Sequence, residues 1–476
     1  MKTSMNTSST YNVVIFLNST FYTNSLDQII EPLISNQSAI VYLFNIHNQE
    51  KLDLTHWEKK NNNIKVEEIT SQFVPPTLTE ETLVIDALFG FELQHPLSGG
   101  FAAVARLINS SKSTVVSIGA PSGLLPEDNT TNNLNHIIKA NYTILTEEPP
   151  LACYFDENQP FLGQWNILPI NPKKEEDLVP FTSEEEVIDI IKPRRRFSHK
   201  GSYGHGLLVA GSLGMAGACS MAASASLKSG IGLLTIHTPL CNRAIHQVST
   251  PEAMVDCDTN EICFSQLLDT TGYKAVAVGP GLGLAEESAT ALQHLILQCE
   301  ELGTPLIIDA DGLNILANYP HLYRNIKGAI LTPHPVEIER LIGKCNNSYI
   351  RLNRAIEFAK KFEVFIILKD AYSFVICPDG SYQLNPTGNE GMATGGSGDV
   401  LTGILLALRA QGYSQEECIK LGTYIHGKAG DLAALEVGKI GMTAQDIIKY
   451  LPKAWKELSE TALKYNGFNL FSNSTN

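Results

Sequence analysis

The sequence predicts an α/β protein built from two parallel sheets, each covered by helices on both faces. Two observations carry this prediction: short, continuously apolar runs recur along the chain, and most are separated by intervals long enough for a helix. A change in texture divides the chain, since its first part is rich in Asn, Ser and Thr and the rest is dense in glycine. At 476 residues the chain is long enough for two domains, which we expect at 1–175 and 185–470.

The N-terminal part contains five apolar runs that predict strands, at 13–17, 39–44, 83–88, 114–118 and 142–145. None of them alternates between polar and apolar residues, which is typical of parallel strands buried on both faces. A polar stretch with Pro and Glu, from about 171 to 186, predicts the connection to the second domain.

The C-terminal part repeats this alternation with more glycine. Strands are expected at 207–210, 233–236, 275–278, 306–309, 330–331 and 365–368, and helices at 216–229, 286–301, 400–411, 415–437 and 444–458. Domains of this kind bind ligands at the carboxyl ends of their strands. The residues that directly follow each strand are therefore the first candidates for function.

Composition excludes several kinds of partner. The chain has 35 Lys and Arg residues against 50 Asp and Glu residues, a net charge of −15, so we expect no nucleic acid and no anionic membrane as a partner. The nine cysteines are scattered, odd in number and free of C-x-x-C spacing, which favours a reducing compartment. No secretory leader or membrane-length apolar run is recognisable, and we expect a cytoplasmic protein.

The most informative segment is the glycine-rich run 389–399, which ends in Asp399 and passes into an apolar, helix-like stretch. Its glycines let the backbone turn consecutive N–H groups toward one point, and the following helix adds its positive end, which is how proteins hold phosphate. A carboxylate at the mouth of such an anion site repels phosphate. We therefore interpret Asp399 as a general base toward a neighbouring hydroxyl.

Three other expected strand ends carry candidate residues. The run 279–283 (GPGLG) predicts a tight turn that lets the backbone approach a ligand, with a plain strand–helix turn as the alternative. Asp309 and Asp311 follow the next strand; they suit a metal or a sugar hydroxyl, or Asp311 caps a helix. His334 lies between two prolines and is expected in an extended, poorly solvated loop that contacts ligand, with Glu337 in the first turn of the next helix.

Cations and small residues follow or precede further strands. Lys369 would place an ammonium at the same rim as the glycine-rich run, where it suits a phosphate, unless it is simply solvated. Residues 198–206 combine a lysine, two histidines and three glycines and predict a flexible, anion-facing loop, with an ordinary linker as the alternative. The run 211–218 opens a helix of small residues that could seat a flat ligand.

Seven of these motifs, in this order, resemble the ADP-dependent NAD(P)H-hydrate dehydratase family, whose fold is ribokinase-like. They are SHKGSYGHG (198–206), GSLGMAGA (211–218), VGPGLG (278–283), DADGLN (309–314), LTPHPVE (331–337), LKDAYS (368–373) and NEGMATGGSGDVLTG (389–403). The resemblance implies an N-terminal Rossmann-like three-layer domain followed by a ribokinase-like α/β/α domain. It extends over nearly all of the chain from 193 to 451.

The resemblance also implies a reaction. Such enzymes remove water from the 6-hydroxylated nicotinamide ring of damaged NADH or NADPH, with ADP or ATP as phosphate donor and Mg²⁺ bound with the nucleotide. Asp399 would deprotonate the ring hydroxyl and also contact the substrate, together with Ala218, Gly283 and His334. The residues that match the family's adenine-nucleotide loops are Lys369, Asp370, Ala371, Tyr372, Ser373, Asn389, Glu390, Gly391, Met392, Ala393, Thr394, Gly395, Gly396, Ser397 and Gly398. Asp370 departs from the family, which usually has glycine there.

The N-terminal part resembles the NAD(P)H-hydrate epimerase domain that is often fused to this dehydratase, in a degenerate form. Asp86 and Ser122 match positions that help to bind K⁺ in working members, so K⁺ is expected only if this half retains its site. The loop after the first strand, 18–25, contains no glycine where the family has a phosphate loop, and Gly119 replaces an expected Asp. The family's helices before the first strand are also missing. We predict that this half is catalytically inactive.

Other interpretations stay open from the sequence. A ribokinase-like kinase for a small vitamin precursor would share the glycine-rich run and its Asp, and a fully bifunctional epimerase and dehydratase or a non-enzymatic nucleotide-binding scaffold is also conceivable. Hydrated NADH or NADPH and an adenine nucleotide are the expected small-molecule partners. The small-residue helices and the resemblance favour a homo-oligomer, a tetramer or larger. The preference between ADP and ATP, or between the two hydrates, is not encoded in a way we can recognise.

Overall fold

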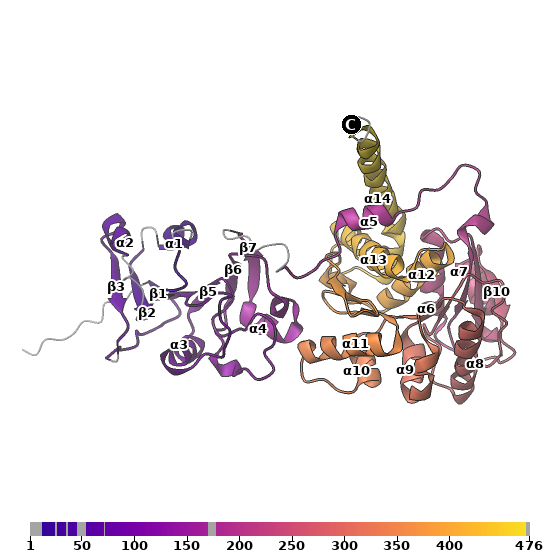
Figure 1. Ribbon diagram of the computed structural model, residues 1–476, viewed down its shortest axis with the longest axis horizontal. Coiled ribbons are helices and arrows are strands. Elements are labelled where there is room, and N and C mark those ends of the chain that lie inside the picture. Colours follow the sequence, from indigo (N-terminus) through magenta and orange to yellow (C-terminus); the bar gives the residue numbers. More distant parts are fainter. Residues whose placement is uncertain are drawn as a thin grey trace, which may run out of the picture. The chain divides into compact units, whose positions relative to one another are not determined.

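The computed structural model describes residues 12–23, 26–34, 37–44, 54–70, 72–169 and 178–472. Two compact units make up the chain: residues 1–179 with 347–349, and residues 180–346 with 350–476 (Figure 1). Most of the expected connection, residues 171–177, lies outside the described residues, as do the segment before the first strand and the end of the loop 18–25.

The first unit is built on a seven-stranded sheet in which every neighbouring pair is parallel. Its order is β3-β2-β1-β4-β5-β6-β7, with β1 Val13–Asn18, β2 Ala39–Phe44, β3 Ile64–Glu68, β4 Leu83–Ala87, β5 Thr114–Ile118, β6 Tyr142–Leu145 and β7 Gln164–Ile167. The five predicted strands are confirmed. The two that were missed, β3 and β7, are the edge strands. Their sequences IKVEE and QWNI mix polar with apolar residues because most of their side chains are exposed or half-buried.

Helices cover both faces of this sheet. Figure 1 shows α1 (Asp27–Ile34) and α2 (Thr55–Lys60) on one side and α3 (Gly99–Ser110) on the other. Successive residues of β1 enter opposite cores: Ile15 packs with α1 and α2, and Phe16 packs with α3. Because both faces are buried, the strands read as continuous apolar runs, and the predicted three-layer arrangement is confirmed.

The second unit is built on a nine-stranded sheet of order β10-β9-β8-β11-β12-β13-β14-β15-β16. The strands are β8 His205–Val209, β9 Leu233–Thr238, β10 Met254–Cys257, β11 Ala275–Val278, β12 Leu306–Ile308, β13 Ile330–Leu331, β14 Phe365–Leu368, β15 Phe374–Ile376 and β16 Tyr382–Leu384. The first seven in this order pair in parallel, whereas β15 and β16 add an antiparallel extension after β14. All six predicted strands are confirmed; β10, β15 and β16 were not predicted.

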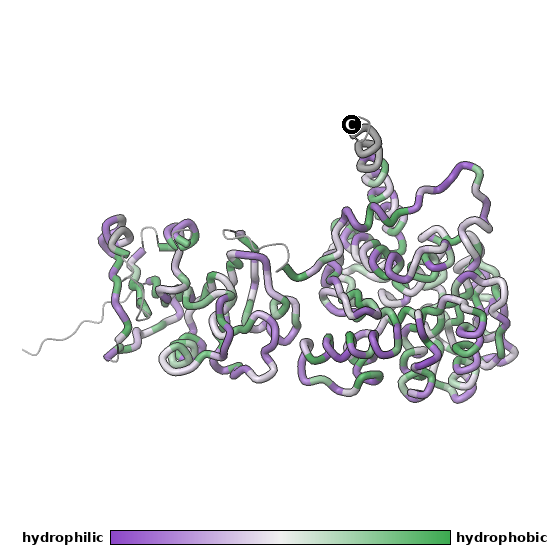
Figure 2. Tube along the Cα trace, in the orientation of Figure 1, coloured by the Kyte–Doolittle hydropathy of each residue, from purple (hydrophilic) through white to green (hydrophobic). Residues whose placement is uncertain are grey.

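The helices of this unit form the outer layers. They are α5 Glu184–Ile190, α6 Ala216–Lys228, α7 Arg243–Ser249, α8 Glu286–Leu302, α9 Ala310–Asn318, α10 Pro335–Ile342, α11 Ser348–Phe362, α12 Ser397–Ala410, α13 Gln415–Val437 and α14 Ala444–Ser472. One large core joins α6, α12, α13 and α14 to the sheet. Figure 1 shows α8 to α11 on the other side of the sheet. In Figure 2 the outer helix α11 is largely hydrophilic. The five predicted helices are confirmed, although α12 begins at Ser397 and therefore includes Asp399 in its first turn.

Across the described ranges, no helix is both long and apolar enough to cross a membrane.

The contact between α6 and α12 leaves no room for a side chain at Gly403. A Cβ built there would overlap the carbonyl oxygen of Ala222, and the Gly403 carbonyl accepts a hydrogen bond of 2.8 Å from the Ser226 hydroxyl. Replacing a helical glycine with alanine normally stabilises a helix by about 1 kcal/mol. Here the overlap reverses the sign, and we expect Gly403→Ala to lower the free energy of unfolding by about 1–3 kcal/mol in urea titrations.

Gly217, in the first turn of α6, is the matched control because a Cβ built on it meets no atom within 4 Å. Gly217→Ala should leave the free energy of unfolding unchanged or raise it by up to about 1 kcal/mol. Equal effects of the two substitutions would show that the close packing of α6 on α12 is not what makes glycine necessary at 403.

Candidate active site

The candidate site lies where four neighbouring strands of the second unit end. Val278, Ile308, Leu331 and Ile366 are successive partners across β11, β12, β13 and β14. The segments that follow them therefore begin together at the carboxyl ends of these strands, which is where doubly wound sheets bind ligands. We call this row of strand ends the edge of the site. The structure thus brings together Asp309, His334 and Lys369, as the sequence predicted, with the first turn of α12 beside them.

Lys369 is the central cation of this edge. Its ammonium lies 3.0 Å from Oδ1 of Asp309 and 3.9 Å from Oε2 of Glu337, and all three side chains are largely buried. Asp309 is 1% exposed, and its second oxygen accepts a hydrogen bond of 2.7 Å from the Thr402 hydroxyl on α12. Burial by itself would lower the pKa of Lys369, but the carboxylates of Asp309 and Glu337 raise it above its ordinary value. Lys369 therefore stays charged, and the alternative of a solvated lysine is wrong.

Asp399 shares this cluster without a partner of its own. A Cβ on the neighbouring Gly398 would lie 3.2 Å from the Lys369 ammonium, so the lysine reaches the first turn of α12. Burial and the negative charges of Asp309, Asp311 and Glu337 raise the pKa of Asp399 to about 7, although Lys369 opposes them. Within the part of the chain that the structure describes, no hydrogen bond reaches its carboxylate. Such a carboxyl exchanges protons near neutral pH, as a general base must.

The glycine-rich run ends in a backbone turn that opens toward this carboxylate. Gly396 precedes α12 at φ +93°, a conformation that glycine adopts without strain, and Ser397 is the first helical residue. The N–H groups of the first turn of an α-helix lack intrahelical partners and carry its positive end, so an anion placed there is stabilised. The predicted anion site and the predicted base are therefore adjacent.

The glycine-rich loop also contacts helix α13, whose residues the sequence did not indicate as part of the site. His426 Nε2 lies 3.3 Å from the Ser397 hydroxyl, and Asp431 accepts hydrogen bonds from Gly388 and Asn389 at the start of the loop. The available signal was the pair of glycines at 427 and 430 inside a helical pattern, because such glycines usually have a packing reason.

His334 is placed differently from the expectation. Its backbone is extended (φ −83°, ψ 171°) and it caps α10, with Nδ1 accepting from the N–H of Val336 at 3.1 Å. Glu337 closes the cap in return by accepting from the His334 N–H at 2.9 Å. The side chain is 46% exposed, so the predicted poor solvation is wrong: the prolines fix the backbone, while the capping geometry turns the ring outward. His334 lies at the open side of the cluster.

Ala218 and Gly283 lie on one wall near Asp311. The Gly283 N–H donates to Asp311 Oδ2 at 2.9 Å, and Ala218 in the first turn of α6 packs against Gly281. Asp311 does not cap α9, because the helix begins at Ala310 and Asp309 occupies the capping position. The capping interpretation of Asp311 is therefore wrong; its carboxylate holds the 279–283 turn instead.

The segment 369–373 forms the loop of the β14–β15 hairpin. The Lys369 N–H donates to the Pro333 carbonyl at 2.9 Å, which ties this loop to the one that carries His334. Asp370 and Ala371 are exposed, Tyr372 and Ser373 are half-buried, and Asp370 accepts a hydrogen bond of 2.8 Å from the Ala371 N–H.

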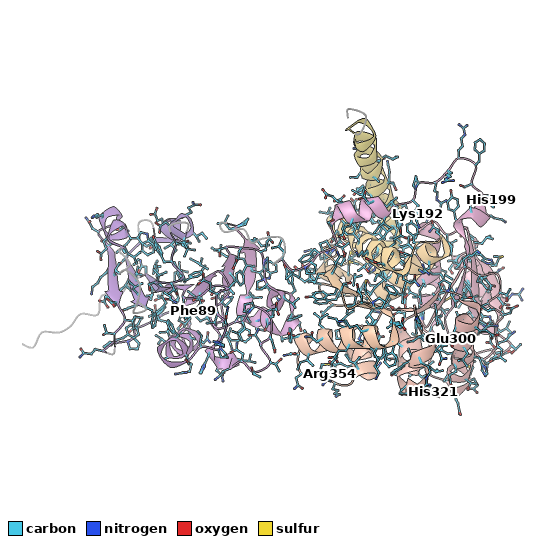
Figure 3. The ribbon with its side chains drawn as sticks, in the orientation of Figure 1. Phe89, Lys192, His199, Glu300, His321 and Arg354 are labelled. Atoms are coloured by element: carbon cyan, nitrogen blue, oxygen red, sulfur yellow. The ribbon has the colours of Figure 1, made fainter. Side chains whose placement is uncertain are left out.

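The loop 198–206 is not part of this edge. It joins α5 to β8, and Lys192 and His199, labelled in Figure 3, lie on this connection. Both line a cavity of about 570 Å³ together with Gln411 and Tyr413, which follow the last residue of α12. Since Asp399 is in the first turn of this 14-residue helix, about 20 Å separates the two regions.

In the first unit, Asp86 and Ser122 are adjacent but fully occupied by each other and by their neighbours. Asp86 is 0% exposed; it accepts hydrogen bonds from the Ser122 hydroxyl (2.6 Å), the Ser122 N–H (2.8 Å), the Ser117 hydroxyl (2.8 Å) and the Leu88 N–H (3.3 Å). Ser122 accepts in turn from the N–H of Phe89, which is labelled in Figure 3. With these oxygens engaged, the pair as it stands does not fit a potassium ion.

The loop after β1 also satisfies itself. The N–H groups of Phe21 and Tyr22 donate to the carbonyl oxygen of Asn18 at 3.1 and 3.2 Å, and that of Thr20 donates to the Asn18 side chain at 3.2 Å. The Phe21 ring packs against Gly90, which follows β4. Beside it lies a cavity of about 330 Å³ whose lining includes Glu92 and Glu147 and no Lys or Arg. Among the described residues of this loop, the N–H groups of Thr20, Phe21 and Tyr22 are therefore already engaged by Asn18.

No group of three or more His, Cys, Asp or Glu side chains within the described ranges is placed to hold a metal ion. At the Asp399 site, Asp309 and Glu337 already face Lys369. A magnesium site made by protein side chains alone therefore does not fit this edge.

Two family models match this chain, one in each of its two units. A family model described as NAD(P)H-hydrate dehydratase matches residues 206–453, and a model described as YjeF-related protein N-terminus matches residues 33–150. The second match begins after β1 and its loop, the part of the N-terminal unit that departs from the expected pattern.

Named relatives resemble either the whole chain or its second unit. The bifunctional NAD(P)H-hydrate repair enzyme of Thermofilum pendens is 34% identical over 83% of this chain and 77% of its own length. The ADP-dependent (S)-NAD(P)H-hydrate dehydratase of Bacillus subtilis is 34% identical over 58% of this chain and 98% of its own length. A crystal structure of the B. subtilis ADP/ATP-dependent enzyme, obtained with ATP and Mg²⁺, matches 59% of this chain and 99% of that one, with a TM-score of 0.50 and 31% identity.

A ribokinase-like protein of Enterococcus faecalis also matches, with a TM-score of 0.53 and 26% identity over 59% of this chain and 96% of that protein. The expected ribokinase-like fold of the second unit is thereby confirmed.

Proposed function

The chain belongs to the NAD(P)H-hydrate dehydratase family, and from this premise we propose that it repairs hydrated NADH and NADPH by removing water from the (6S) hydrate, with ADP or ATP as phosphate donor. The observation that carries the proposal is the position of Asp399. A carboxyl with a pKa of about 7 lies between a helix N-terminus that can hold phosphate and a buried, charged lysine. Phosphorylation of a hydroxyl needs these three groups together.

In the proposed reaction, Asp399 takes the proton of the ring hydroxyl while the hydroxyl oxygen attacks the terminal phosphorus of the nucleotide. The N–H groups at the start of α12 and the Lys369 ammonium stabilise the charge on the transferred phosphoryl group. Inorganic phosphate then leaves the ring with the former hydroxyl oxygen, the neighbouring ring carbon gives up a proton to water, and the double bond is restored. Mg²⁺, when bound with the nucleotide, would neutralise phosphate charge, and we assign it no protein ligand.

The remaining site residues divide between the two substrates in this proposal. Ala218, Gly283 and His334 flank Asp399 from the side of β11, α6 and α10, and they would hold the hydrated nicotinamide. The adenine nucleotide would lie along the two loops 369–373 and 389–398. Asp370 keeps its side chain on its own loop through Ala371, so it does not obstruct this path.

We further propose that the N-terminal half does not catalyse epimerisation. The N–H groups of Thr20, Phe21 and Tyr22 donate to Asn18. Asp86 accepts four hydrogen bonds, and Phe21 packs against Gly90. The nearby cavity is lined by two glutamates, which repel the phosphates of a dinucleotide. We propose that this half serves structure or assembly, including the homo-oligomer expected from the sequence.

The dehydratase assignment is tested by mixing the protein with ATP or ADP and (6S)-NADHX and following the absorbance band of reduced nicotinamide. We expect the band to return, and we expect Asp399→Asn to reduce turnover by at least about 10³-fold with ADP binding largely retained, because the variant loses the base and keeps the shape of the site.

The same assay separates the alternatives. No recovery of the band, together with stoichiometric phosphorylation of another alcohol, would assign the chain to the small-molecule kinases instead. Activity that survives in Asp399→Asn would remove Asp399 from the role of base.

The pH dependence follows from the pKa of Asp399. A base must be deprotonated, so kcat/KM should rise about tenfold per pH unit below pH 7 and level off above it. Lys369 lowers this pKa, so Lys369→Met should shift the inflection upward by about one unit or more. Lys369→Arg, which keeps the charge, is the control and should leave the inflection close to that of the wild type. An inflection that stays in place in Lys369→Met would contradict the assignment of the titrating group.

Loss of epimerase function predicts that the protein leaves (6R)-NADHX unchanged. We expect no R-to-S interconversion above the spontaneous rate when the two hydrates are separated chromatographically after incubation without nucleotide. The Escherichia coli relative, which is named as bifunctional, provides the positive control. Interconversion that scales with the concentration of this protein would show that its N-terminal half is active.

A further inference from the structure

Helix α13 contacts the loop 387–397 at both of its ends and at Met392 between them. Thr387 donates its hydroxyl hydrogen to the Tyr424 carbonyl at 2.8 Å. Asp431 accepts from the Gly388 N–H and from the Asn389 side chain, each at 2.9 Å. The contacts at the far end of the loop are made by His426. The loop therefore has anchors at both ends on one rigid helix.

Two glycines of α13 make this close approach possible. A Cβ at Gly427 would overlap the hydroxyl and carbonyl of Thr387, and a Cβ at Gly430 would overlap the sulfur of Met392. Glycine inside a helix costs about 1 kcal/mol relative to alanine. At both glycines the loop fills the space that a side chain would take, so direct contact between helix and loop offsets this cost.

His426 holds the other end of the loop in an unusual electrostatic setting. Its Nε2 lies 3.3 Å from the Ser397 hydroxyl, in the residue that begins α12. Burial and the nearby charge of Lys369 lower the pKa of His426 to about 4, against the opposing effect of a hydrogen bond with the Ser397 backbone. The imidazole is therefore neutral at physiological pH. A neutral ring can orient Ser397 without adding a second charge to the Lys369 cluster.

We infer that α13 is the support of the nucleotide loop, and that His426 and Asp431 are positioning residues that set the affinity of the site for the phosphate-bearing nucleotide. Asp431 fixes the start of the loop through Gly388 and Asn389, and His426 fixes its end through Ser397, so the turn that leads into α12 is held in place before the ligand arrives. Preorganisation of this kind increases affinity because less conformational entropy is lost on binding. The inference rests on the proposed function, since it takes this loop to be the nucleotide loop.

The test is the dissociation constant for ADP, measured by calorimetry on the full chain without hydrated substrate. Asp431→Asn leaves one acceptor oxygen where the Gly388 N–H and the Asn389 side chain each need one. His426→Leu removes the contact with Ser397. Each should raise Kd and the KM for nucleotide by about tenfold or more, with kcat lowered by less than about threefold. His426→Gln keeps a polar nitrogen near the Nε2 position and should bind ADP within about threefold of the wild type.

Lys428→Gln is the matched control on the same helix. Its ammonium lies 3.8 Å from Glu184 on α5 and 3.9 Å from Glu457 on α14, away from the loop, and the substitution should leave Kd and KM unchanged. Melting temperatures of all variants identify any that fail to fold, and recovery in His426→Gln separates positioning from general stability.

Unchanged ADP affinity in both Asp431→Asn and His426→Leu would overturn the inference, as would a fall in kcat with Kd and KM unaltered. A wild-type protein that binds no adenine nucleotide would instead refute the proposed function. The two failures are therefore distinguishable in one set of titrations.

Discussion

The rest of the site depends on one interaction, the burial of the Lys369 ammonium among carboxylates at adjoining strand ends. Asp309 lies 3.0 Å from this ammonium, Glu337 lies 3.9 Å away, and Asp399 is close enough for its pKa to respond. A buried cation is tolerated only when it is paired, and the surplus of negative charge then falls on the carboxyl with no hydrogen bond of its own. This is why Asp399 has a pKa near 7. The parallel register of β11 to β14 creates the cluster by bringing four strand ends into one row.

The two units place an aspartate in opposite surroundings: Asp86 lies within β4, and Asp399 lies in the first turn of α12. Asp86 accepts four hydrogen bonds that favour its charged form, yet it has no open side, because Ser117, Ser122 and Leu88 enclose it. Desolvation still raises its pKa, as it does for Asp399. The difference lies in access: Asp399 faces the turn at Gly396, whereas the loop near Asp86 donates its N–H groups to Asn18. A carboxyl that matches a family motif is therefore insufficient evidence of function without the backbone that surrounds it.

The buried helix α12 connects the packing of the second unit to its chemistry. Ten of its fourteen residues are buried, and it contacts α6 so closely that Gly403 has no room for a side chain. Such a helix cannot shift along its axis without opening the core, so its first turn is held at a fixed position relative to the sheet. Helix α13 then fixes the loop that leads into this turn. The site is thus placed by packing on one side and by hydrogen bonds on the other.

The sequence by itself determined the parallel strands of the two sheets, the order of the motifs and the glycine-rich turn that leads into the helix of Asp399, because buried parallel strands and glycine-rich turns each leave a local pattern. It did not reveal β3, β7 and β10, whose polar edge residues carry no such pattern, or the short β15–β16 hairpin. Tertiary structure alone decided that Asp311 holds the 279–283 turn, that His334 faces solvent and that the 198–206 loop lies away from Asp399. It also brought His426 and Asp431 to the glycine-rich loop. These roles depend on which atoms meet across the fold, and spacing along a chain does not encode that distance.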